Sequence, residues 1–121
     1  MIRRLASARP HLRDETGAGG VLALAIVAAT VVCALAAVML GSALATRQRV
    51  VAAADASALA AADALLGAVP GEPCTLAAEV AAAHRVALIR CVLEGAEARV
   101  ATGTELLGVP VHAESRAGPA P

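Results

Sequence analysis

The hydrophobic pattern of the chain is dominated by one long segment without charge. No Asp, Glu, Lys or Arg occurs between Thr16 and Thr46, and the densest apolar part, residues 21–45, has 25 residues. A helix that crosses a membrane needs roughly 20 apolar residues. We therefore predict a transmembrane segment over residues 17–46, preceded by a leader at residues 1–16.

Arginines on the two sides of this segment predict its orientation, because basic residues accumulate on the cytoplasmic side of membrane helices. Four arginines precede the segment and two follow it: Arg3, Arg4, Arg9 and Arg13 on one side, Arg47 and Arg49 on the other. We expect a single-pass protein of the cell membrane, with a cytoplasmic N-terminal leader and an extracytoplasmic C-terminal domain.

A removed secretory signal peptide is the alternative. The Ala-Leu-Ala sequence at residues 43–45 has the small-residue form of a cleavage site, and the N-terminus is basic. The apolar part of a signal peptide, however, typically has about 7–15 residues. Asp14 and Glu15 also lie where a signal peptide is positively charged. The membrane anchor is the interpretation that we adopt.

The pattern stays helical beyond the membrane segment. Alanine, the best helix former, dominates the sequence up to Gly67, which supplies a C-terminal stop. We expect residues 47–67 to continue the same helix outside the membrane. Val51, Leu59 and Leu66 share one side of it, with Asp55 between the first two.

Asp55 and Asp63 admit two interpretations. They are either solvated residues of a weakly amphipathic helix, or part of a face that packs against another protomer. Their spacing leaves both interpretations open.

Residues 68–116 are predicted to form a small α+β domain, followed by a disordered tail at 117–121. A loop at 68–73 leads to a second helix over residues 75–88, with Thr75 as its N-cap. Its expected apolar stripe consists of four residues at helical spacing: Leu76, Val80, Ala83 and Ala87.

Short strands are expected after this helix, at residues 89–93, 96–102 and 109–115, with Glu94-Gly95 as a tight turn. Pro110 predicts that the last strand lies at an edge. The expected fold class is therefore α+β, with a long N-terminal helix, a second short helix and a small antiparallel sheet of about three strands.

Composition excludes some functions. The chain has 34 alanines, no lysine and no Phe, Tyr or Trp, and its ten arginines balance ten acids. Aromatic stacking on nucleic-acid bases is therefore excluded, and a strongly basic nucleic-acid surface is not expected. We expect no nucleic-acid partner and no small-molecule substrate.

Two of the three cysteines predict a covalent cross-link in a domain that has few large core residues. Cys74 and Cys91 both lie in the exported part, where thiols tend to be oxidised, so we predict a disulfide between them. Cys33 lies in the membrane segment and is read as an inert small side chain.

A metal site built from Cys74, His84, Cys91 and His112 is the rival interpretation. Its spacings match no standard zinc motif, and oxidation would consume both sulfurs. No H-E-x-x-H, G-x-S-x-G or Walker-type glycine loop occurs either. We expect no metal, no cofactor and no enzymatic activity.

Two segments carry a family resemblance. The sequence DETGAGGVLALA at residues 14–25 resembles the leader and helix start of TadE/TadG-type Flp pilus-assembly proteins. The sequence RQRVVAAADASALA at residues 47–60 is similar to the alanine-rich continuation of the helix in that family. Cys74 and Cys91, which bracket an alanine-rich helix, resemble a short actinobacterial TadE-like branch found near secretion-type genes.

This resemblance implies a membrane-anchored minor pilin or pseudopilin of a tight-adherence pilus or a type II-like secretion apparatus. Other pilin-like subunits, a membrane platform protein and a cytoplasmic ATPase are the partners that it implies. Small residues four apart, Ala37, Gly41 and Ala45, would let neighbouring membrane helices approach closely. With Asp55 and Leu59 they form the predicted helix-packing residues.

The sequence departs from the family pattern at one position. Prepilins carry a glutamate five residues after the processed glycine, but this chain has Leu22 when counted from Gly17 and Ala25 when counted from Gly20. We therefore expect the leader to remain attached. The alternative function is a small secreted or membrane-tethered binding domain unrelated to pili.

Overall fold

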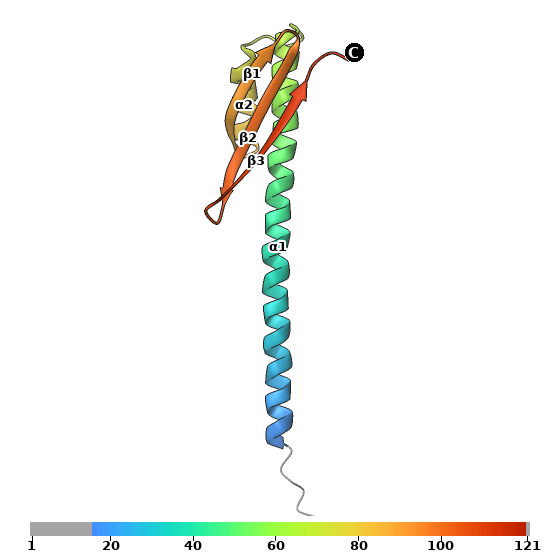
Figure 1. The fold of residues 1–121 in the computed structure, drawn as a ribbon, viewed down its shortest axis with the longest axis vertical. Coiled ribbons are helices and arrows are strands. Elements are labelled where there is room, and N and C mark those ends of the chain that lie inside the picture. Colours follow the sequence, from blue (N-terminus) through green and yellow to red (C-terminus); the bar gives the residue numbers. More distant parts are fainter. Residues whose placement is uncertain (1–15, 121) are drawn as a thin grey trace, which may run out of the picture. The chain divides into compact units, whose positions relative to one another are not determined.

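The computed structural model describes residues 16–120, which divide into two compact units, one ending at Val38 and one beginning at Met39. The predicted leader, apart from Thr16, lies outside the described residues. Five elements follow one another (Figure 1): α1 (Thr16–Leu65), α2 (Pro73–Ala83), β1 (Ala87–Glu94), β2 (Glu97–Leu106) and β3 (Val109–Ala117). The predicted α+β fold is confirmed.

Helix α1 is a single helix of 50 residues. It contains a segment that is long and apolar enough to cross a membrane, by length and composition. Gly67 ends the helix as predicted, with a φ of 75° that a residue with a side chain rarely adopts. The amide of Ala68 donates to the Asp63 carbonyl at 2.8 Å, and that of Gly67 donates to the Ala64 carbonyl at 3.1 Å. This pair of bonds satisfies two of the last carbonyls of the helix.

Helix α2 begins earlier than expected, and its cap is not Thr75. Glu72 is the N-cap: its carboxylate accepts from the Thr75 amide at 2.6 Å and from the Thr75 hydroxyl at 2.8 Å. Pro73 occupies the first turn, where its missing N–H has no partner to lose. The predicted cap was wrong because the longer Glu72 side chain reaches the amide that Thr75 itself presents.

Helix α2 also ends earlier than expected, at Ala83 rather than at residue 88. Arg85 takes a φ of 60° and reverses the chain, with the Val86 amide donating to the Ala81 carbonyl at 3.1 Å. Val86 and Ala81 belong to the same buried cluster, so an apolar contact closes this end. The residues after Val86 pair in the sheet instead, because strand pairing there outweighs local helical preference.

The buried side of α2 also differs from the predicted stripe. Ala77 and Ala81 are the buried residues, whereas Leu76 and Val80 are half-buried and Ala83 is exposed. The small side chains face inward because they let α2 approach α1: Ala77 clusters with Ala58, Ala61 and Ala62 of α1.

The three strands form one antiparallel sheet in the order β1-β2-β3. Because β3 pairs with β2 alone, it is an edge strand, as Pro110 predicted. Strand β2 continues beyond residue 102 to Leu106 and joins β3 through a two-residue turn, Leu107-Gly108. The predicted end of this strand at residue 102 was therefore four residues too early.

The core between the helices and the sheet consists of small side chains. Figure 1 shows α2 and the sheet beside the C-terminal part of α1, which belongs to the same unit. On the sheet, Ala98 and Val100 of β2 are fully buried against this part of α1. The residues that α1 buries recur every three or four positions: Val50, Ala53, Ala54, Ser57, Ala58, Ala61 and Ala62.

Candidate functional site

The exposed strip along α1 that flanks its packed residues is the most distinctive surface of the second unit. We call it the open face. Its residues up to Leu59 recur at a spacing of three or four, which places them on one side of a helix. Leu66 follows seven positions later, directly after the last residue of α1. The open face comprises Leu44, Arg47, Gln48, Val51, Asp55, Leu59 and Leu66, all of them exposed.

The open face reverses the usual arrangement of an amphipathic helix. A helix on a globular domain normally buries its large apolar residues. Here α1 buries alanines, while Leu59 is 59% exposed and Leu66 is 54% exposed. Leu44, Arg47, Val51 and Asp55 line a shallow depression on this face. Leu44, Val51 and Leu59 of α1 are therefore free to contact another molecule.

Opposite charges lie on the same face. Arg47 and Asp55 are separated by eight positions, or about 12 Å along a helix with a rise of 1.5 Å per residue. Among residues 16–120, the ion pairs all lie on the sheet: Arg90–Glu114, Arg99–Glu94 and Arg116–Glu97. Arg47 and Asp55 can thus pair with complementary charges on a second helix. The exposure of Asp55 fits both the solvated and the packing interpretation.

The predicted helix-packing residues divide into two groups. Ala37, Gly41 and Ala45 are exposed, and a Cβ atom added at Gly41 would meet nothing within 4 Å. Asp55 and Leu59 both lie on the open face. Their role in helix packing stays a prediction.

The predicted disulfide between Cys74 and Cys91 is present, with a Cα–Cα distance of 5.8 Å. It joins the first turn of α2 to the middle of β1. Cys91 also packs against the alanine cluster of the core. The disulfide therefore fixes α2 on the sheet.

The two histidines of the rival metal site lie on different elements. His84 caps the C-terminal end of α2, and His112 lies on β3. Both candidate sulfur ligands are joined in the disulfide. In the described part of the chain, no group of three or more metal-binding side chains could hold an ion.

A second exposed surface lies on the side of the sheet that faces away from the helices. Arg90 of β1 and Glu114 of β3 form an ion pair above Ala101 of the central strand. Ile89 and His112 complete a shallow groove there. Arg90 and Glu114 line this groove and are paired with each other across it.

The sequence reasoning missed one structurally important residue, Thr102. Its hydroxyl donates to the Val50 carbonyl oxygen at 2.9 Å, and both residues are fully buried. The alternation of Val100, Thr102, Thr104 and Leu106 along β2 is the signal that could have placed Thr102 on the inner face.

Comparisons of the chain with profiles of known protein families, with curated proteins and with solved structures find no match. Function is therefore inferred from the residues and their arrangement.

Proposed function

We propose that this protein is a membrane-anchored, pilin-like structural subunit of a tight-adherence pilus or a type II-like secretion apparatus. In this proposal residues 17–46 span the cell membrane, and the α2–sheet domain lies outside the cytoplasm. The leader remains attached in the cytoplasm. The open face of α1 binds the corresponding helix of another pilin-like subunit.

The observation that supports this function most strongly is the two-sided character of α1. The helix runs without a break from the apolar segment into the domain. It buries one side on its own sheet and leaves the leucines of the open face without a partner. A helix that served only to hold the domain would gain nothing from exposed Leu59 and Leu66, whereas a subunit of an assembly uses such a face for contact.

The charges of the open face also favour a helical partner. A second helix with an acid and an arginine at matching levels would pair with Arg47 and Asp55, and a like helix carries both. Charged pairs at the rim of a contact set register and partner choice more than affinity. The sequence resemblance to TadE/TadG-type proteins agrees with a partner of this kind.

Affinity purification of the full chain from its own membranes tests this function. We expect other pilin-like subunits and a polytopic platform protein to co-purify with the wild-type chain. Leu59→Glu should remove the pilin-like subunits without unfolding the domain, since Leu59 is exposed. Ala82→Glu, which places the same charge on an exposed position of α2, is the matched control and should retain them. A wild-type chain that purifies alone would favour the tethered binding domain instead.

A further inference from the structure

The turn between β2 and β3 is unusually apolar. We call Leu106, Leu107 and Val109 the apolar tip. Leu107 is 83% exposed and Val109 is 61% exposed, and Leu107 is the most exposed of the large apolar residues in the described chain. An isolated exposed leucine needs no explanation, but here Leu107 and Val109 are exposed together, with half-buried Leu106 beside them.

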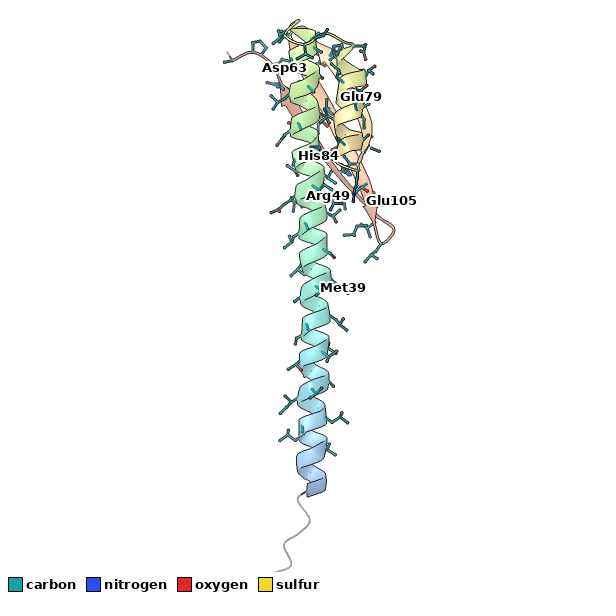
Figure 2. All side chains as sticks on the ribbon, turned by 180° about the vertical axis from the view of Figure 1, so that it is seen from behind. Met39, Arg49, Asp63, Glu79, His84 and Glu105 are labelled. Carbon is teal, nitrogen blue, oxygen red and sulfur yellow. A yellow bond between two sulfur atoms is a disulfide. The ribbon has the colours of Figure 1, made fainter. Side chains whose placement is uncertain are left out.

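The apolar tip lies beside the end of the charge-free segment of α1. Ala43, Leu44 and Arg47 of α1 line one depression together with the tip. Arg47 is the first charged residue after Glu15. In Figure 2 the hairpin extends from Glu105, near the level of Arg49, toward the end of the unit marked by Met39. The tip therefore reaches the place along α1 where apolar sequence gives way to charge.

The hairpin at the other end of the sheet has the opposite chemistry. Its turn, Gly95-Ala96, is flanked by the paired acids Glu94 and Glu97. Both hairpins belong to the same sheet and both have two-residue turns. The apolar one is the one beside the apolar part of α1, so its composition follows its position.

The backbone conformation of the tip does not favour a leucine at position 107. Leu107 and Gly108 have φ values of 51° and 78°, and a two-residue turn with both values positive favours Asn, Asp or Gly. A leucine at the first position is strained and is not buried in the core. Neither the turn nor the core therefore accounts for a leucine at this position.

We propose that the apolar tip inserts into the membrane interface, in the leaflet from which α1 emerges. This inference rests on the proposed function, because it requires that residues 17–46 span the membrane. Leu107 and Val109 would lie among the upper acyl chains, at the level where the charge-free segment of α1 ends. The chain has no Trp or Tyr, the residues that commonly hold proteins at this level.

The hairpin is suited to this depth and no deeper. Leu106 pairs with Val109, so the backbone of the tip is largely hydrogen-bonded within the hairpin. Glu105, one residue before the tip, is exposed and would remain in water. The domain would thus be held at two points, by α1 and by the tip.

Tryptophan fluorescence can locate the tip, because a single introduced Trp is the only aromatic residue in the chain. Leu107→Trp, Ala96→Trp and Leu35→Trp would each be reconstituted as the full chain in phosphatidylcholine vesicles containing brominated lipid. We expect blue-shifted, quenched emission at positions 107 and 35, and unquenched emission at position 96. Lack of quenching at 107 with quenching at 35 would overturn the tip contact alone. Lack of quenching at 35 would overturn the membrane anchor and the tip contact together.

Equal quenching at positions 96 and 107 would also overturn the inference, because the whole domain would then lie on the lipid. A second experiment, with Trp at position 109 and Leu107→Asn, avoids placing the large Trp side chain in the turn itself. Leu107→Asn suits the positive φ and keeps the fold, so Val109→Trp should lose most of its quenching when Leu107→Asn is added. Unchanged quenching of Trp at 109 in that background would contradict a role for Leu107 in the contact.

Discussion

The hydroxyl of Thr102 donates a hydrogen bond to the carbonyl oxygen of Val50, 52 residues earlier in the chain. Val50 is the first fully buried residue of α1, and Thr102 lies in the middle of the central strand. The bond fixes the sheet at one level along the helix, in a core whose small alanines would otherwise tolerate sliding. That level places the apolar tip beside Ala43 and Leu44.

Thr102→Val should lower the free energy of unfolding by about 1 kcal/mol, because it removes one buried hydrogen bond at nearly constant volume. Urea unfolding of the full chain in detergent, followed by circular dichroism, measures this change. Thr104→Val, two residues further along the same face, is the matched control. Equal effects of the two substitutions would contradict a specific role for the bond to Val50.

The disulfide should contribute more to the free energy of unfolding than the hydrogen bond of Thr102 does. Its cysteines are 17 residues apart, and closing a loop of this size stabilises a fold by roughly 3 kcal/mol. Cys91→Ser, or reduction of the wild-type protein, should therefore lower the unfolding free energy by about 2–4 kcal/mol. Cys33→Ser should leave it unchanged, since Cys33 is an exposed free thiol of α1. A reduced protein as stable as the oxidised one would refute this contribution.

The apolar segments and the turn residues of the sequence predicted much of this fold. The charge-free segment, the alanine-rich continuation and Gly67 located α1, and Pro110 identified the edge strand. The two cysteines indicated their own pairing. Each of these features is local, or depends on one strong physical constraint, such as the length needed to cross a membrane.

The errors arose where contacts distant in sequence decide the structure. Helix α2 stops at Ala83 because the residues after Val86 gain strand partners in β2, which no local pattern contains. Strand β2 extends to Leu106 because β3 pairs with it as far as Val109. The open face was foreseen in part from Val51, Asp55 and Leu59. The sequence pattern did not predict that alanines rather than leucines of α1 face the core. The packing of the sheet against this helix decides which side is buried.

Glu72 makes the start of α2 sensitive to acid. Hydrogen bonds from the Thr75 hydroxyl, the Thr75 amide and the Cys74 amide hold the pKa of Glu72 below its ordinary value of 4.5. Its cap therefore stabilises the fold fully above that value and loses its effect as the pH falls through the lowered pKa.

Comparison of the wild type with Glu72→Gln over a pH series checks this prediction. The wild type should be the more stable protein at neutral pH, and the difference in unfolding free energy should shrink as the pH falls below 4.5. Glu79→Gln, which removes a charge from the middle of α2 without touching the cap, is the control. A difference that grows on acidification would have the wrong sign for a lowered pKa.

Close packing of alanines predicts sharp differences between neighbouring positions of α2. Ala81 is fully buried, whereas Ala82 is exposed. Ala81→Leu should lower the unfolding free energy by about 1–3 kcal/mol, since the larger side chain forces α2 away from α1. Ala82→Leu should change it little. Similar effects in the two variants, measured by urea unfolding, would show that α2 does not pack through this face.

Site-specific photo-crosslinking in the native membrane tests the central claim most directly. A photoreactive residue at position 59, in the middle of the open face, should form a covalent adduct with a second pilin-like subunit, identified by mass spectrometry as having an N-terminal apolar helix. The same residue at Glu79, on the exposed side of α2, should form no such adduct. The absence of this adduct at position 59, or its equal formation at position 79, would contradict assembly through the open face.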